Sequence, residues 1–265
     1  MRRVAGLATP PLMLAVISPA KSLDLSSPLP SLPASPPVFG EDAERLAAAA
    51  SKLGPKRLGD LMHISPKLAQ LNADRFRDFG QAEPRPAIYT FAGDVYAGFE
   101  VKSLDPEAVL FAQDHLRILS GLYGLLRPLD AIRPYRLEMG TRWAPGRTKD
   151  LYGFWKERVA KALVGDAAGA PIINLASKEY WHAVAPHLPA GTRVIEIDFK
   201  DEGPSGLRFN TFAAKRARGT VARYICEHRL ADPDALKGFT DDGYAYDPDG
   251  SDEHRWRFTR LVRQD

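Results

Sequence analysis

Short apolar runs rich in branched side chains constrain this chain most, because such runs pack best as buried strands of a β-sheet. Four of them are clear: Leu14–Ala20, Ala170–Ser177, Arg193–Phe199 and Gly206–Phe212. The last two bracket a turn at residues 202–206, which is the pattern of a β-hairpin. The segment 241–262, DDGYAYDPDGSDEHRWRFTRLV, predicts two further aromatic strands around an acidic loop.

Amphipathic segments lie between these runs and predict helices. They are Glu41–Gly54, the two helices that flank His63–Ser65, Asp105–Ile118, Thr148–Gly165 and Ala213–Leu230. Asp105 and Pro106 form a good helix start, with a capping side chain followed by a proline in the first turn. Strands and helices do not alternate regularly, so we expect an α+β fold with a mixed central β structure wrapped by helices. At 265 residues, a single compact domain over 13–265 can bury one core.

The start of the chain and its single cysteine bear on where the protein works. Residues 1–12 are expected to be a disordered extension, with Met13 beginning the first strand, and either Met1 or Met13 could be the true start. No apolar run reaches the roughly 20 residues of a membrane span, so no membrane contact is expected. Cys226 alone cannot form a disulfide framework within one chain, which suits the cytoplasm.

Charge and motif content exclude several common function classes. Net charge is only +3, from 36 Lys and Arg against 33 Asp and Glu, so local clusters must identify a partner. The chain contains no G-x-S-x-G, H-E-x-x-H or G-x-x-x-x-G-K-[ST] motif, and its six histidines form no i, i+4 pair on a helix. We expect no metal and no cofactor. Because Cys226 falls within a predicted helix, a redox-sensor role is not assigned to it.

Two segments carry basic residues that could meet an anion. In the helix AAKRARGTVARYICEHRL, the cations Lys215, Arg216, Arg218 and Arg223 fall on one face roughly 160° wide, at about 100° per residue. This face is either solvated or bound to an anionic partner. The segment Arg133–Arg158 interleaves basic and aromatic side chains, as a nucleic-acid surface does. Aromatics facing the core with Arg stems around them would give the same pattern.

The stretch LGDLMHISPKLAQLN, from Leu58 to Asn72, joins two short helices through three residues. A helix-hairpin-helix element typically has a Gly-apolar-Gly turn whose backbone N–H groups face a DNA phosphate. Here His63, Ile64 and Ser65 occupy the turn, and the missing glycines restrict close approach to a phosphate. Ser65 can still cap the second helix, leaving amide donors at a positive helix end. Separately, Ser18 and Lys21 match an S-x-x-K spacing, but its partner motifs are missing, so anion binding is favoured over acylation.

Several longer motifs together resemble one family. They are VISPAKSL, LMHISPKLAQLNADRF, FAGDVYAGF, ILSGLYGLLRPLDAIRPYRLEMGTR, KDLYGFWKERV, INLASKEYW and FAAKRARGTVARYI. They resemble the YaaA peroxide-stress family of cytoplasmic bacterial proteins, from Met13 to the C-terminal strands. The resemblance implies a compact mixed fold, a helix-hairpin-helix element and a positively charged cleft for double-stranded DNA. It also implies survival of hydrogen peroxide, with less free iron and less DNA damage.

The resemblance also nominates residues, position by position. Those expected to contact DNA are Lys21, His63, Ile64, Ser65, Lys67, Arg133, Arg136, Lys215, Arg216 and Arg218. A possible shared pocket, without assigned roles, comprises Ser18, Asp94, Tyr96, Glu138 and Asn174.

Three functions follow as hypotheses. The first is a non-enzymatic DNA-binding protein of the peroxide response that grips phosphates with little sequence preference and limits iron-dependent DNA damage. The second is an enzyme that acts on a nucleic acid or nucleotide, with a buried cluster of Lys21, Asp94 and Glu138 as its mark. The third is an iron-sequestering protein, against which the single cysteine and unpaired histidines argue.

Overall fold

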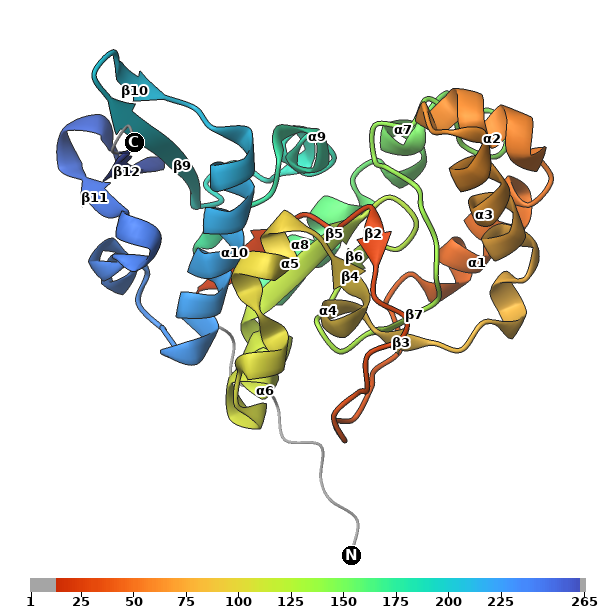
Figure 1. Cartoon of the computed structure of the whole chain (residues 1–265), viewed down its shortest axis with the longest axis horizontal. Helices are drawn as coiled ribbons and strands as arrows, with labels where there is room; N and C mark the ends of the chain where they lie inside the picture. Colours follow the sequence, from red (N-terminus) through yellow and green to blue (C-terminus); the bar gives the residue numbers. More distant parts are fainter. Residues whose placement is uncertain (1–12, 263–265) are drawn as a thin grey trace, which may run out of the picture.

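The computed structural model describes residues 13–262, and its centre is a mixed β-sheet (Figure 1). The strands of this sheet are β1 (Leu14–Ile17), β5 (Leu116–Ser120), β6 (Gly124–Leu126), β8 (Ile172–Asn174), β9 (Val194–Gly203), β10 (Gly206–Arg208), β11 (Ala245–Asp247) and β12 (Arg255–Leu261). Their order is β11-β12-β9-β8-β1-β5-β6, with β10 beside β9. The extension expected over residues 1–12 lies outside the described residues.

Parallel and antiparallel pairs both occur in this sheet. β1 is parallel to β5 on one side and to β8 on the other, β8 is parallel to β9, and β9 is parallel to β12. β6, β10 and β11 pair antiparallel with β5, β9 and β12. Two short ribbons stand apart, β2 (Ser22–Leu23) with β4 (Phe91–Ala92) and β3 (Arg85–Pro86) with β7 (Ala131–Ile132). The mixed sheet confirms the α+β prediction, and the predicted hairpin (β9 with β10) and the two predicted aromatic strands (β11 and β12) are present. The strand predicted over Gly206–Phe212 ends at Arg208, and Thr211 and Phe212 belong to the following helix.

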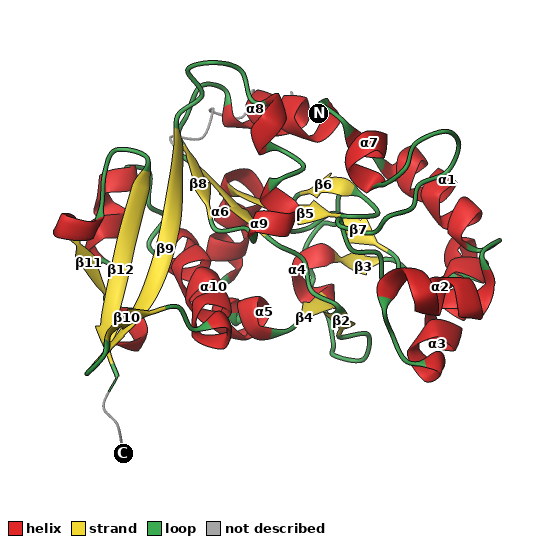
Figure 2. Cartoon of the chain, turned by 90° about the horizontal axis from the view of Figure 1, so that it is seen from above, coloured by secondary structure: helices red, strands yellow, loops and turns green. Residues whose placement is uncertain are grey.

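Helices cover both faces of the sheet. The α-helices are α1 (Gly40–Ala50), α2 (Gly54–Met62), α3 (Pro66–Arg77), α4 (Ala87–Thr90), α5 (Asp94–Phe99), α6 (Pro106–His115), α7 (Leu151–Trp155), α8 (Arg158–Ala167), α9 (Lys178–Trp181) and α10 (Thr211–Glu227). Short 3₁₀ turns are Phe79–Gln81, Val101–Ser103, Ala185–His187, Pro233–Gly238, Asp241–Gly243 and Pro248–Gly250. Figure 2 shows α8 on one side of the strands and α5, α6 and α10 on the other.

The core is centred on β1, whose four residues are fully buried between these helix layers. A strand that is buried on both faces reads as a continuous apolar run, which is why LAVI was recognisable in the sequence. Cys226 is also fully buried, in α10, and burial raises the pKa of its thiol. Among the described residues, no helix is both long enough and apolar enough to span a bilayer.

Two predicted helices differ from the structure. The helix predicted over Thr148–Gly165 breaks at Lys156, whose φ of 43° and ψ of −136° separate α7 from α8. The side chains on either side of the break are anchored in different places: the Trp155 indole donates to the Gly121 carbonyl at 3.0 Å, and Arg158 pairs with Asp42 at 2.8 Å. These tertiary contacts override a helical pattern that was locally consistent.

The helix predicted to run from Asp105 to Ile118 ends at His115. Its last predicted residues belong to β5, where Ile118 lies opposite Ile17 of β1. Leu116 and Ile118 are fully buried there. A short apolar run fits either a buried helix turn or a buried strand, and pairing with the central strand decides the outcome.

Candidate functional site

The sheet places a pocket where its connections diverge. β1 lies between β5 and β8 in the sheet. The chain passes from β1 to β5 on one side and later crosses to β8 on the other side, so the carboxyl ends of β1 and β8 border a topological switch point. In sheets with parallel strands, ligands bind in the crevice at such a point. A cavity of about 450 Å³ lies there, which we call the switch-point pocket. Its walls are residues 18–22 after β1, residues 92–95 around the start of α5, Ser177, Glu179 and Tyr180 at α9, and Lys215 and Arg218 of α10.

Three of the nominated polar residues hold the base of this pocket together. The Ser177 N–H donates to Ser18 Oγ at 2.8 Å, which joins the segments that follow β1 and β8. Tyr96 Oη donates to the Ser18 carbonyl at 3.1 Å, and burial raises the pKa of this phenol well above its usual value. Asn174 Oδ1 accepts the Ala176 N–H at 3.0 Å. Ser18 lines the pocket, while Tyr96 and Asn174 support its walls without lining it.

A close crossing of α5 and α10 places the basic helix beside the pocket. Gly98 of α5 faces the carbonyl oxygen of Arg216, and Gly219 of α10 faces the carbonyl oxygen of Val95, so closely that a Cβ at either glycine would overlap that oxygen. The motifs FAGDVYAGF and FAAKRARGTVARYI therefore contain the two halves of one helix contact. Because the backbones approach so closely, Lys215 and Arg218 reach the same cavity as Asp94, the first residue of α5.

The pocket cations differ in how they are partnered. Lys21 Nζ lies 2.5 Å from Glu138 Oε2, and Arg136 lies 3.0 Å from Glu138 Oε1, so one carboxylate joins two of the nominated cations. Lys215 makes no hydrogen bond or ion pair with any residue in 13–262. Arg218 also lacks such contacts within the described part of the chain, and its Nε is buried without a hydrogen-bond acceptor. Burial lowers the pKa of this guanidinium, which the charge of Asp198 partly opposes.

Two other nominated cations, Arg133 and Arg216, lie outside the pocket and have structural partners. Arg133 donates its N–H to Tyr123 Oη at 2.9 Å and its Nε–H to the Ala82 carbonyl at 3.2 Å. Arg216 lies 3.5 Å from Asp242. Arg223, on the same basic face, pairs with Glu227 and donates to the carbonyls at the end of α5. The basic face of α10 is therefore divided: part of it is tied to acids, and Lys215 and Arg218 face the pocket.

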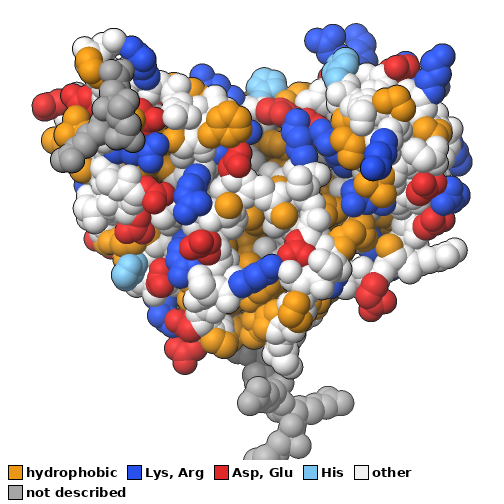
Figure 3. Space-filling view, in the orientation of Figure 1, with side chains coloured by type: hydrophobic (Ala, Val, Ile, Leu, Met, Phe, Trp, Pro, Cys, Tyr) orange, Lys and Arg blue, Asp and Glu red, His pale blue; other side chains and the backbone are white. Residues whose placement is uncertain are grey.

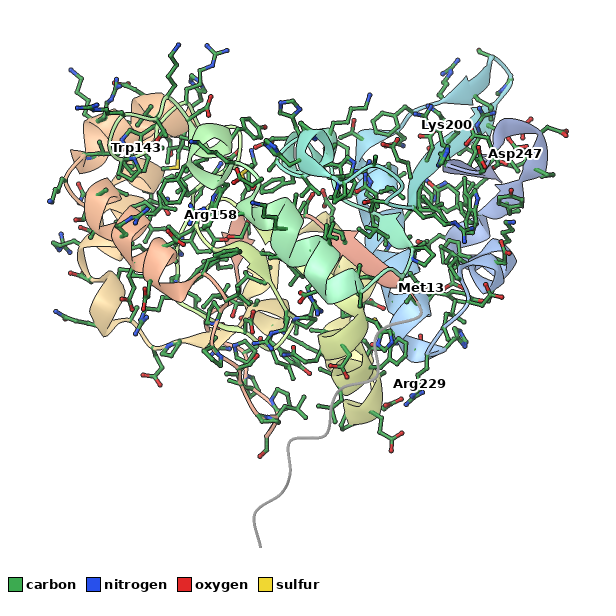
Figure 4. All side chains as sticks on the ribbon, turned by 180° about the vertical axis from the view of Figure 1, so that it is seen from behind. Met13, Trp143, Arg158, Lys200, Arg229 and Asp247 are labelled. Carbon is green, nitrogen blue, oxygen red and sulfur yellow. The ribbon has the colours of Figure 1, made fainter. Side chains whose placement is uncertain are left out.

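The aromatics of the segment Arg133–Arg158 face the core more than they face solvent. Tyr135 is 4% exposed and Trp155 is fully buried. The Arg158 guanidinium lies 5.0 Å from the ring centroids of both Phe154 and Trp155. Seen from behind in Figure 4, Trp143 and Arg158 lie in the same half of the molecule, Trp143 nearer the end that carries α2 and α3 and Arg158 at the start of α8. Of the two interpretations left open by the sequence, the structure favours core packing with Arg stems over a continuous stacking surface.

The helix pair α2–α3 forms a second candidate region, at one end of the long axis (Figure 1). His63 ends α2 in the left-handed conformation, with φ 50° and ψ 51°. Ser65 caps α3 by accepting the Leu68 N–H at 3.4 Å, Pro66 follows, and Lys67 is exposed. Ile64 packs partly against the core. The turn residue His63 thus adopts the backbone region that glycine favours, although no glycine is there.

The cluster that the enzyme hypothesis requires is only partly assembled. Lys21 and Asp94 line one pocket and Glu138 contacts Lys21, but the Lys21 side chain is 61% exposed and Asp94 is also exposed. These groups therefore lie at a solvent-filled mouth and are not buried together. Within residues 13–262, no group of three or more His, Cys, Asp or Glu side chains is arranged to hold a metal ion.

Sequence reasoning missed three pocket residues, Ser177, Glu179 and Tyr180, although their motif INLASKEYW was recognised. Glu179 Oε1 accepts the Gly140 N–H at 2.9 Å, which ties α9 to the loop that carries Glu138. The available signal was positional. β1 is followed directly by Ser18, and Ser177 comes three residues after the end of β8. The carboxyl ends of adjacent parallel strands meet at one edge of the sheet.

Basic side chains lie on more than one part of the face seen in Figure 3. Figure 3 shows Lys and Arg side chains over the end that carries α2 and α3, and others around the hollowed middle of the molecule, with Asp and Glu between them. This face is mixed in charge and not uniformly basic, consistent with a net charge of only +3.

Comparison with known proteins identifies the family. The family model described as "Peroxide stress protein YaaA" matches residues 13–250. A UPF0246 protein of Rhizorhabdus wittichii is 60% identical over 251 residues, covering 94% of this chain and 99% of that protein. UPF0246 proteins of Polynucleobacter asymbioticus and Burkholderia pseudomallei are 48% and 44% identical, covering 88% and 94% of this chain and 93% and 98% of those proteins. The chain belongs to the YaaA family of peroxide-stress proteins.

Proposed function

We propose that this family member binds the phosphate backbone of duplex DNA in the cytoplasm, largely independently of sequence. The observation that carries the proposal is convergence: Lys21, Lys215 and Arg218 come from distant segments and line one pocket. Arg136 joins them through the carboxylate of Glu138. Cations on separate elements that gather at one site are arranged to neutralise phosphates.

The helix pair α2–α3 would supply a second phosphate contact. The exposed Lys67 lies in the first turn of α3, where unpaired amide groups and the helix dipole favour an anion. In Figure 1 the helix pair lies at one end of the long axis, whereas α5 and α10, which contribute walls of the pocket, lie farther along it, so a duplex contacting both regions would follow that axis. Without glycines in the turn, His63 keeps the backbone farther from a phosphate than a Gly-apolar-Gly turn would.

Backbone binding would also account for protection from iron. Cationic side chains that neutralise phosphates release the counterions held there. Fe²⁺ condensed on the duplex would be among the ions released, so less iron would lie beside the sugars that peroxide chemistry attacks. This mechanism requires no metal site in the protein.

Affinity for a fluorescent duplex, measured by anisotropy at a series of salt concentrations, tests the proposal. Phosphate-dominated binding should weaken steeply as salt rises, with log K falling linearly against log salt. Binding that is absent at low salt, or that ignores salt, would contradict it.

A charge-reversal pair connects the binding to the pocket. Lys215→Glu with Arg218→Glu should weaken duplex binding at least tenfold at low salt. The control is Lys161→Glu with Arg193→Glu, which makes the same change in net charge on α8 and just before β9, away from the pocket. If both double variants weaken binding equally, net charge and not the pocket is responsible.

A further inference from the structure

Arg218 is partly buried, and its side chain has no hydrogen-bonded or ion-paired partner among the described residues. It lines the switch-point pocket, and its Nε is buried without an acceptor. Arginine carries five N–H donors in a planar fork that fits phosphate and carboxylate oxygens. A partly buried guanidinium with no protein partner is poised for an anion that enters the pocket, and Lys215 in the same wall adds a second free cation.

The size of the pocket limits what that anion can belong to. At about 450 Å³ it falls within the range of small-molecule sites, and it holds far more than a phosphate ion. A cavity of about 450 Å³ is about 8 Å across if its three dimensions are similar. Intact B-DNA, whose major groove alone is about 12 Å wide, cannot enter a space of this size. A duplex would therefore pass over the mouth, while a single nucleotide can enter.

The remaining walls fit the rest of a nucleotide. The Asp94 side chain makes no hydrogen bond or ion pair with residues 13–262, so its carboxylate is available to sugar hydroxyls or base amino groups and disfavours a phosphate beside it. Ala92, Val95 and the ring of Tyr180 supply apolar surface for a base. A ligand that satisfies these walls carries an anion, hydrogen-bond donors and a flat apolar part.

We propose that the switch-point pocket binds one nucleoside monophosphate unit, with its phosphate on Arg218 and Lys215 and its sugar or base facing Asp94. The unit is either a free nucleotide or a nucleotide extruded from a DNA strand, since both present the same chemistry. This goes beyond backbone binding, which needs only exposed cations and no cavity.

Titration calorimetry of the full chain tests the proposal with three kinds of probe: the ribo- and deoxyribonucleoside 5′-monophosphates, the matching nucleosides, and inorganic phosphate. We expect at least one monophosphate to bind with a Kd below about 1 mM, and its nucleoside and inorganic phosphate to bind at least tenfold more weakly. Arg218→Met should weaken the monophosphate at least tenfold. Arg216→Met removes the same charge from the same helix outside the pocket and should change it less than twofold.

Three results would overturn the nucleotide site: no monophosphate binds, inorganic phosphate binds as tightly as the best monophosphate, or Arg218→Met binds like the wild type. Should Arg218→Met fail to fold, Arg218→Lys keeps the charge while losing the planar fork, and it should still weaken the monophosphate measurably. Whichever variant is used, the proposal is also decided by whether the wild type binds a monophosphate and whether it binds the monophosphate more tightly than inorganic phosphate.

A duplex arm separates the two sources of the nucleotide and the two proposals. The probe is a duplex that carries the fluorescent base 2-aminopurine opposite an abasic site. If the DNA strand supplies the nucleotide, its fluorescence should rise with the wild type and not with Arg218→Met. If the pocket takes free nucleotides, its fluorescence should stay low with both proteins. Lys67→Met should weaken duplex binding and leave monophosphate binding unchanged. If a monophosphate binds but a duplex does not, only the proposal of backbone binding is contradicted. If a duplex binds but no monophosphate does, only the proposal of a nucleotide site in the pocket is contradicted.

Discussion

The switch-point pocket and the helix pair α2–α3 are assembled in opposite ways. The pocket draws its walls from segments between residues 18 and 218 and depends on the sheet and on the α5–α10 crossing. The helix pair is continuous in sequence, from Gly54 to Arg77, and its geometry comes from a local cap and a three-residue turn. Long-range packing thus fixes the first region, and local backbone chemistry fixes the second.

Each region also stores an unfavourable feature where binding is proposed. In the pocket, the Nε of Arg218 is buried without an acceptor, which costs free energy in the unbound protein. In the helix pair, His63 occupies the left-handed region, which costs a non-glycine residue about 1 kcal/mol. Features of this kind persist where surrounding structure enforces them, and they cluster at functional sites.

The helix crossing under the pocket gives the largest expected effect. Gly219→Ala would place a Cβ against the carbonyl of Val95. Because that carbonyl belongs to the backbone, it cannot rotate away as a side chain could. We expect the free energy of unfolding to fall by about 3 kcal/mol, and α5 and α10 to separate. Urea denaturation followed by circular dichroism measures the change.

The control for this variant is Gly165→Ala, in α8, where a Cβ would meet no atom within 4 Å. Alanine is the better helix former, so this change should raise stability by up to about 1 kcal/mol. If Gly219→Ala is as stable as Gly165→Ala, the crossing of α5 and α10 does not require a glycine at position 219, and the two helices do not hold the pocket walls rigidly.

The unpartnered arginine gives the next largest effect, with the opposite sign. Arg218→Met removes a buried unsatisfied N–H and keeps most of the side-chain volume, so the unliganded protein should become more stable by about 1 kcal/mol. Arg216→Met, which loses only an exposed contact to Asp242, should change stability by less than about 0.5 kcal/mol. Thermal unfolding without added anions measures both, and destabilisation by Arg218→Met would show that Arg218 has a structural role.

The contrast between the two regions also explains what could be predicted from sequence. The helix pair was readable because its signals are local: apolar periodicity on both sides of His63–Ser65, then Ser65 and Pro66 at a helix start. The α+β class followed from the order of strands and helices. The break at Lys156 and the strand at Leu116–Ser120 were not readable, because contacts with Gly121, Asp42 and β1 decide them.

The pocket was predicted only in part for the same reason. The resemblance to a family nominated Ser18, Lys21 and Asp94, and the sheet brings these together. It also nominated Arg133 and Arg216, which have partners elsewhere. Helical periodicity places Arg216 and Arg218 roughly 160° apart, at opposite edges of the basic face, but it does not say which edge meets the cavity. Which of them faces the cavity depends on how α10 crosses α5.

A smaller effect is expected in the helix pair. His63→Gly should relieve the left-handed strain and stabilise the protein by about 0.5 to 1 kcal/mol, while letting a phosphate approach the turn more closely. Glu100→Gly is the matched control, since Glu100 ends α5 with φ 46° and lies outside the helix pair. Both variants should unfold at higher urea, but only His63→Gly should tighten duplex binding. Equal duplex affinity in all three proteins would remove the turn from the proposed contact.

The smallest effect concerns Asp24, the residue that follows β2. Asp24 bonds Lys102 Nζ at 2.9 Å and accepts from Ser26 and Ser27, and the Lys102 ammonium contributes most to holding the pKa of this carboxyl well below its usual 3.8. Because the folded pKa lies below the unfolded one, this stabilisation is fully present above about pH 4 and is lost as the pH falls through the folded pKa.

Asp24→Asn should therefore lower the thermal midpoint at pH 7, with a smaller difference from the wild type at pH 3. Asp60→Asn, at an exposed position with no hydrogen bond or ion pair to the described residues, should show no such convergence. A difference for Asp24→Asn that is independent of pH would mean that hydrogen-bond geometry, and not carboxylate charge, accounts for the stabilisation.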